Sequence, residues 1–115
     1  MNIIAKSATI VNPMDMYNLT KSPDRTKLSE AAGEVVELDK WVVYTESNAK
    51  GEEVTLASFT TKDNRAFTTN SGTFIRDFTS AVTMFSEFGT EFSTIQIVEG
   101  TSKNGRKFIT CKVVA

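Results

Sequence analysis

The feature that most constrains the fold is a change of hydrophobic period between residues 73 and 85. Apolar side chains in this segment recur at the spacing of one helix face, whereas the patterned segments on both sides alternate with a period of two. They are Phe74, Ile75, Phe78, Val82 and Phe85. Asn70 or Ser71 suits the cap of such a helix, and Gly89 suits its end. The sequence therefore predicts one helix within a chain of strands.

Three strands are predicted before this helix and two after it. They cover residues 34–47, 52–61, 66–69, 92–100 and 106–114, which are rich in β-branched and aromatic residues and are separated by turn-forming clusters. In the last of these turns, Asn104 and Gly105 favour positive φ angles. This order is that of the OB-fold, a mainly β, five-stranded Greek-key barrel that is partly open and has a helix between strands three and four.

The first third of the chain is patterned less regularly. It predicts a strand over residues 2–11, a short helix over 14–19 after Asn12-Pro13, a break at Ser22-Pro23, and a second short helix over 27–32 that Gly33 closes. A length of 115 residues suits one domain. We expect a single OB-fold domain over residues 1–115, in which residues 1–33 are an N-terminal extension packed on a barrel formed by residues 34–115.

Charge is distributed unevenly along the chain. Residues 1–99 hold nine basic and fourteen acidic side chains, whereas residues 100–115 hold four basic and no acidic ones, so the net charge is −1. A nearly neutral protein exerts no global attraction on nucleic acid or on an anionic membrane. Any site for an anion must therefore be local.

Several classes of function are disfavoured by residues that the chain lacks. It has no histidine and a single cysteine, which removes Ser-His and Cys-His catalysis and a zinc site of His and Cys ligands. We therefore expect no enzyme, no cofactor and no metal. Cys111 lies in an apolar strand pattern and is interpreted as core filler. No apolar run reaches the length of a membrane span, so we expect no membrane partner and a location in the cytoplasm.

The last hairpin combines positive charge with an aromatic ring. If Ile109, Cys111 and Val113 form the apolar row of the final strand, then Phe108, Thr110 and Lys112 lie on its other face. Phe108 is thus predicted to be exposed, and Lys107 is predicted to point outward at the rim. The basic candidates of this cluster are Lys103, Arg106, Lys107 and Lys112. Single-strand binding needs such cations for phosphates and flat rings for base stacking.

A second cluster surrounds the turn at residues 62–65. It consists of Lys62, Arg65, Phe59 and Phe67, and Arg76 and Lys50 extend it as a basic track. Trp41 and Tyr44 are three positions apart and should face opposite sides of a strand, so at most one is expected at the surface. We expect the two turns to lie side by side and to form one cationic trough floored by accessible rings.

Each of these features also has an interpretation without function. Aromatic side chains in strands usually fill the core, which is the favoured interpretation for Phe59, Phe67 and Trp41 taken singly. Lysine and arginine beside turns often do no more than solvate them, which applies to Lys62, Arg65, Lys103 and Arg106. The coincidence of cations with rings favours the functional interpretation.

Three runs of sequence together resemble a known family. They are "GEVVELDKWVVY", "DNRAFTTNSGTFIRDF" and "SKNGRKFITCKVV". The chain is similar, from about Tyr17 onward, to the single-stranded DNA-binding proteins encoded by phages of Gram-positive bacteria. The resemblance implies an OB-fold that coats single-stranded DNA without sequence preference, no catalytic residues, and DNA contacts in "TKDNRAF" and "SKNGRKF".

The leading hypothesis is accordingly sequence-nonspecific binding, coating and protection of single-stranded DNA during phage replication or recombination. The alternative is a phage-encoded protein-binding module, an inhibitor or adaptor of a host protein, which uses a strand edge or an acidic face. An oligosaccharide-binding barrel ranks third because it leaves the basic hairpin unexplained. Self-association through strand edges, with the N-terminal strand as candidate, and contacts with replication or recombination proteins stay open.

Overall fold

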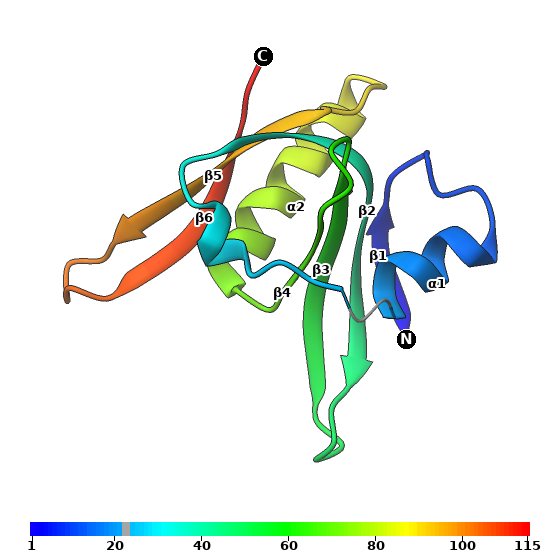
Figure 1. The fold of residues 1–115 in the computed structure, drawn as a ribbon, viewed down its shortest axis with the longest axis horizontal. Coiled ribbons are helices and arrows are strands. Elements are labelled where there is room, and N and C mark those ends of the chain that lie inside the picture. Colours follow the sequence, from blue (N-terminus) through cyan, green and yellow to red (C-terminus); the bar gives the residue numbers. More distant parts are fainter. Residues whose placement is uncertain (22–23) are drawn as a thin grey trace.

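The computed structural model describes residues 1–21 and 24–115 and contains six strands, two α-helices and one short 3₁₀-helix (Figure 1). The strands are β1 (Asn2–Lys6), β2 (Val35–Ser47), β3 (Glu53–Thr61), β4 (Ala66–Thr69), β5 (Thr94–Thr101) and β6 (Lys107–Val113). The helices are α1 (Pro13–Lys21), the 3₁₀-helix η1 (Leu28–Ala31) and α2 (Gly72–Glu87). None of the described helices is long and apolar enough to span a bilayer.

All six strands belong to one open antiparallel sheet in the order β4-β3-β2-β5-β6, with β1 added beside β2. The long strand β2 connects two parts of the sheet. Its first residues, from Val35 to Glu37, pair with β5, and from Leu38 onward it pairs with β3. A register shift between Leu38 and Lys40 marks the change of partner. Such an irregularity bends a strand and increases its twist, which lets one sheet curve around a core.

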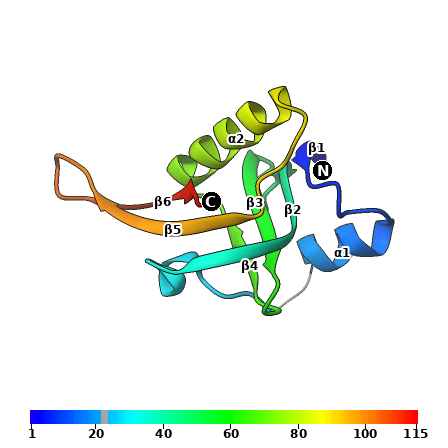
Figure 2. The same cartoon turned by 90° about the horizontal axis from the view of Figure 1, so that it is seen from above.

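Helix α2 covers the inner face of this curved sheet (Figure 2). The Ser71 side chain caps the helix by accepting a hydrogen bond from the Phe74 backbone N–H at 3.3 Å. Phe74 and Phe78 follow one helical turn apart and are fully buried. The ring of Phe78 meets that of Trp41 edge to face at 5.1 Å between centroids. The helix predicted from the 3.6-residue period is therefore present and supplies the centre of the core.

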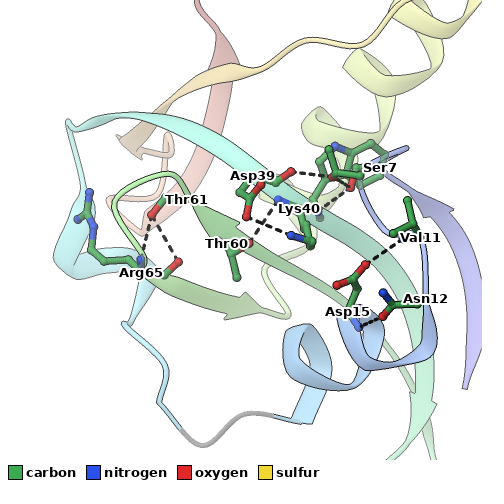
Figure 3. Close-up of polar contacts among 11 residues, drawn as sticks. Ser7, Val11, Asn12, Asp15, Asp39, Lys40, Thr60, Thr61 and Arg65 are labelled. Atoms are coloured by element: carbon green, nitrogen blue, oxygen red, sulfur yellow. Dashed lines mark hydrogen bonds and ion pairs between the residues drawn. The ribbon is translucent and has the colours of Figure 1, made fainter.

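The opposite face of the sheet is covered by the N-terminal segment. Leu19 of α1 and Ile10 pack on Val42 and Tyr44 in a second buried cluster. Asn12 caps α1 by accepting a hydrogen bond from the Asp15 backbone N–H at 2.9 Å, and Asp15 accepts one from Val11 at 3.0 Å (Figure 3). The extension thus packs on β2 and β3.

The first predicted strand is longer than the observed one. Strand β1 ends at Lys6 because the next polar side chains bond to the backbone of β2: Ser7 Oγ accepts from Trp41 N–H at 3.0 Å, and Thr9 Oγ1 donates to the Asp39 carbonyl at 2.7 Å. The predicted helix over 27–32 is the four-residue 3₁₀-helix η1. The predicted break at Ser22-Pro23 lies outside the described residues. The remaining elements agree with prediction within three residues at each end.

Candidate nucleic-acid interface

The outer part of the β5–β6 hairpin, residues 99–108, extends from the body as a two-stranded ribbon (Figures 1 and 2). We call it the basic ribbon. Its turn closes through hydrogen bonds from Ser102 N–H to the Arg106 carbonyl at 2.8 Å and from Gly105 N–H to the Ser102 carbonyl at 2.9 Å. Gly105 has a φ of 76°, as predicted for this turn, whereas Asn104 does not adopt a positive φ.

The cations of the basic ribbon are accessible. Lys103 and Arg106 are exposed, and within the described part of the chain no ion pair involves them. Lys107 is also exposed, and its Nζ lies 3.8 Å from a Glu99 carboxylate oxygen, which is a loose and solvated pair. With one acid and three bases, the ribbon presents a net positive charge to solvent.

Phe108 lies at the base of the basic ribbon and is partly exposed. Its ring covers the backbone of Gly100, the residue directly opposite on β5. It is absent from the side chains that pack on the core, whereas Ile109, Cys111 and Val113 of the same strand do pack there. The alternation predicted for the last strand is therefore confirmed, and Phe108 lies outside the core.

A groove with a volume of about 680 Å³ opens beside this ring, between β6 and the segment that follows β4. Its lining includes Lys27, Leu56, Thr68, Asn70, Lys107 and Phe108. The lining also contains the apolar side chains of Leu28 and Ile109, further hydroxyl groups, and one carboxylate, that of Glu99. A hydrogen bond from Ser71 Oγ to the Ile109 carbonyl, 3.1 Å long, ties the two walls together. This combination of ring, cations and polar groups suits an extended chain of bases and phosphates.

The cation of Arg65, in the β3–β4 turn, is neutralised by two carboxylates. Its guanidinium lies 3.0 Å from Asp63 and 3.0 Å from Glu34, and it also sits over the ring of Phe67 at 5.6 Å. The hydrogen bond to Asp63 raises the pKa of Arg65, and Glu34 adds to this effect. Hydrogen bonds from Thr61 and then Arg65 lower the pKa of the Asp63 carboxyl. Arg65 is therefore occupied by partners within the protein.

Comparison with known protein families identifies the chain. A model of the phage single-stranded DNA-binding protein family matches residues 5–114, which is nearly the whole chain. The chain belongs to this family. It is therefore a binding protein and not an enzyme, and its family binds single-stranded DNA. Neither the curated proteins nor the solved structures that were compared with the chain match it.

The prediction that the two basic turns lie side by side in the fold is wrong. The basic ribbon and the β3–β4 turn do not lie side by side: both views place the ribbon tip at one extreme of the molecule and the turn in the body (Figures 1 and 2). Lys62 is exposed in that turn, and its backbone N–H bonds to the Glu37 carbonyl of β2 at 2.9 Å. The turn is thus held against β2, which keeps it away from the ribbon.

None of the four strand aromatics, among which we expect one or two accessible rings, is accessible, and the interpretation of Phe59, Phe67 and Trp41 as core residues is confirmed. Trp41, Phe59 and Phe67 lie in the core under α2 and are at most 4% exposed. Tyr44 does face the opposite side from Trp41, as predicted, but α1 covers that side, and the Tyr44 hydroxyl lies 3.2 Å from Ser58 Oγ. Phe59 stacks on Phe67 at 4.8 Å. These rings cannot receive a base unless the body opens.

Three further predicted cations are exposed at separate places. Lys112 lies in β6, opposite Gln96, and Lys50 lies at the β2–β3 turn, away from the basic ribbon in Figure 1. The Arg76 side chain is 70% exposed and pairs with Asp77 at 3.1 Å. Arg76 also borders a hollow of about 430 Å³ that shares Asn70 with the groove. Arg76 therefore lies where a chain leaving the groove past Asn70 would pass.

Sequence reasoning missed the polar members of the groove outside β6, which include Lys27 and Asn70 and also the carboxylate of Glu99. Lys27 reaches the groove because the preceding residue joins the edge of β4, with Thr26 N–H bonded to the Ala66 carbonyl at 2.7 Å. No local pattern signals a contact between residues 40 positions apart. The sequence predicts Asn70 only as a candidate helix cap, and Ser71 is the residue that caps.

Proposed function

We propose that the chain binds single-stranded DNA without sequence preference along the groove and the basic ribbon. The observation that carries this proposal is the partly exposed Phe108 ring between the groove and three accessible cations of the ribbon. Lys103, Arg106 and Lys107 hold phosphates, with Lys27 on the opposite wall. Phe108 stacks on one base. Stacking accepts any base, because each base has a flat aromatic face.

We further propose that the curved sheet is an OB-fold barrel. Strands β2 to β6 supply its five strands, in the order β4-β3-β2-β5-β6, and α2 joins the third to the fourth. Among the described residues β4 and β6 form no ladder with each other, and the groove lies between them. This is the opening of a partly closed Greek-key barrel, the architecture that binds oligonucleotides through one face and its loops.

In the cell, this binding coats and protects single-stranded DNA exposed during phage replication or recombination, in the host cytoplasm. Arg76 and Lys112 extend the phosphate contacts beyond the groove. Lys62 adds a distant contact, and Arg65 mainly holds the β3–β4 turn to Glu34. The buried rings of Trp41, Tyr44, Phe59 and Phe67 stabilise the body and do not touch DNA.

Self-association is proposed through β1. This strand pairs with β2 on one edge only among the described residues, and its Ile3 and Ile4 side chains are about half exposed. An unpaired edge with apolar side chains favours addition of another strand. We expect a mass by light scattering above that of one chain, and a return to one chain when Ile4→Lys is introduced. One chain at every concentration would refute this contact.

The DNA-binding proposal is tested by fluorescence anisotropy of a labelled oligothymidine. Trp41 is a poor reporter because its indole is buried beneath α2. We expect binding at about 50 mM salt that weakens steeply by about 200 mM, since phosphate contacts act through counterion release. An oligothymidine and an oligomer of mixed sequence should bind within a fewfold of each other.

Absence of binding at low salt would overturn the proposal. It would favour the protein-binding alternative, for which recovery of one stoichiometric host partner is the direct test.

A further inference from the structure

Gly100 is the one glycine of the chain at which another residue fills the space that a side chain would take. A Cβ atom built on Gly100 would lie 2.4 Å from Cζ, 2.7 Å from Cε2 and 3.0 Å from Cε1 of the Phe108 ring. The other five glycines have open space within 4 Å of the same position. Only a residue without Cβ therefore lets the ring lie against the backbone of β5.

The backbone itself does not require glycine at this position. Four glycines of the chain have positive φ angles, namely Gly33, Gly51, Gly89 and Gly105, whereas Gly100 does not. A glycine inside a strand normally weakens it, because it has no side chain to pack and loses more entropy on folding. Close approach of another group is one of the recognised reasons for such a glycine. Here that group is Phe108.

Among the described residues, neither the core nor another aromatic ring holds the Phe108 ring in place. Phe108 is outside the core cluster, and no described aromatic ring stacks on it. Gly100 and Phe108 face each other directly across the β5–β6 ladder. An aromatic ring laid over a cross-strand glycine is a recognised stabilising device of sheets. The glycine thus covers one face of the ring and fixes its orientation.

We propose that Gly100 is a positioning residue for DNA binding: it seats Phe108 flat on the ribbon, so that the opposite ring face receives a base. This inference rests on the proposed function. A fixed ring binds more tightly than a mobile one because its rotamer freedom is already restricted before the base arrives. Any side chain at position 100 displaces the ring and removes that advantage.

The geometric part of the proposal is tested on the unaltered protein by NMR. The Gly100 α-protons lie under the Phe108 ring, so we expect their resonances to move upfield through the ring current. Phe108→Leu should return them to ordinary values. Ordinary shifts in the unaltered protein would overturn the proposal, even if the variants below fail to fold.

The functional part compares four proteins by oligothymidine anisotropy: the unaltered chain, Gly100→Ala, Phe108→Ala and the double variant. Loss of one stacked base should weaken binding about 5- to 150-fold for Phe108→Ala. Gly100→Ala should give a loss within a fewfold of that, and the double variant should bind no more weakly than Phe108→Ala. Ser47→Thr is the control, because it adds one methyl at an exposed strand position beside the β2–β3 turn, and it should bind like the unaltered chain.

The outcomes separate this inference from the proposed function. If Phe108→Ala binds normally, the stacking role fails and the proposed function loses its central contact. If Phe108→Ala weakens binding and Gly100→Ala does not, only the positioning role fails. Additive losses in the double variant would also overturn it, since Gly100 would then act independently of the ring.

Discussion

The body of the molecule and the basic ribbon use the same kinds of residue for opposite purposes. In the body, Trp41, Phe59 and Phe67 are closed in by α2, and Arg65 is paired with two carboxylates. In the ribbon, Phe108 keeps an open side, and Arg106 has no described carboxylate partner. A ring or a cation of this protein is therefore available for a ligand only where neither the helix nor an acid reaches it.

Charge follows the same division. The nine bases and fourteen acids of residues 1–99 give a net charge of −5, whereas the four bases of residues 100–115 give +4. The chain is therefore acidic over most of its length and concentrates its excess positive charge in its last sixteen residues.

The largest expected effect comes from a ring of the body. Phe67→Ala should lower the free energy of unfolding by about 3–5 kcal/mol, because it removes a fully buried ring and leaves a cavity beside Phe59. Urea denaturation followed by circular dichroism measures this loss. Phe108→Ala is the matched variant in the ribbon and should cost less than about 1 kcal/mol, as expected for a partly exposed side chain. Equal costs would abolish the distinction between body and ribbon.

The second effect concerns Cys111, in the part of β6 that belongs to the body. Burial raises the pKa of the Cys111 thiol to about 12, so little thiolate is present near neutral pH. Against a free cysteine with the ordinary pKa of 9.0, we expect thiol–disulfide exchange at pH 8 to be slowed roughly 30-fold or more, allowing for the greater nucleophilicity of a more basic thiolate.

The rate is measured with a chromogenic disulfide, before and after unfolding in urea. Because the folded state disfavours the thiolate, stability should also fall as the pH rises above the ordinary thiol pKa of 9.0 towards 12. Rapid labelling of the folded protein would show that Cys111 is accessible.

A smaller effect is expected from the ribbon cations. The double variant Lys103→Gln/Arg106→Gln should lower the slope of log affinity against log salt by about 1.4, at about 0.7 for each single-strand phosphate contact. Anisotropy titrations at several salt concentrations give this slope. Lys50→Gln, the same change at the β2–β3 turn, is the control and should leave it unchanged. A slope that responds equally to both variants would mean that the ribbon has no special role.

The smallest effect is expected for Arg65→Gln. This arginine is already neutralised by Asp63 and Glu34, so its removal should change the salt slope by well under the 0.7 of one phosphate contact. Arg106→Gln, at the turn of the ribbon, is its counterpart and should remove one full contact. Should Arg65→Gln weaken binding as much as Arg106→Gln, the two carboxylates must release Arg65 when DNA binds.

The local sequence pattern was sufficient to predict the helices and strands and the apolar face of the last strand. The helix expected over residues 73–85 is present and extends from Gly72 to Glu87. Its apolar side chains recur with a helical period, and this period marks the side that packs on a core without information on the rest of the fold. The apolar row of Ile109, Cys111 and Val113 was likewise correct. Both depend only on neighbours within a few residues.

Local pattern was insufficient where a distant segment covers a face. Tyr44 was predicted to face away from Trp41, and it does, but α1 lies over that side and buries it. Arg65 was predicted to be a free cation, and Glu34, 31 positions earlier, neutralises it. Lys27 enters the groove only because Thr26 joins the edge of β4. In each case the deciding contact joins residues far apart in the sequence.

The strand and helix periods, the family resemblance and the concentration of positive charge in the last sixteen residues can be read from the amino-acid order. Which rings are covered and which cations are neutralised depends on the folded arrangement. Periodicity and charge are properties of the chain, whereas burial and ion pairing depend on where separate segments meet. Phe67 and Phe108 are each the second residue of a strand that follows a basic turn, yet Phe67 is buried in the core, where it stacks on Phe59, and Phe108 stays partly exposed outside that core.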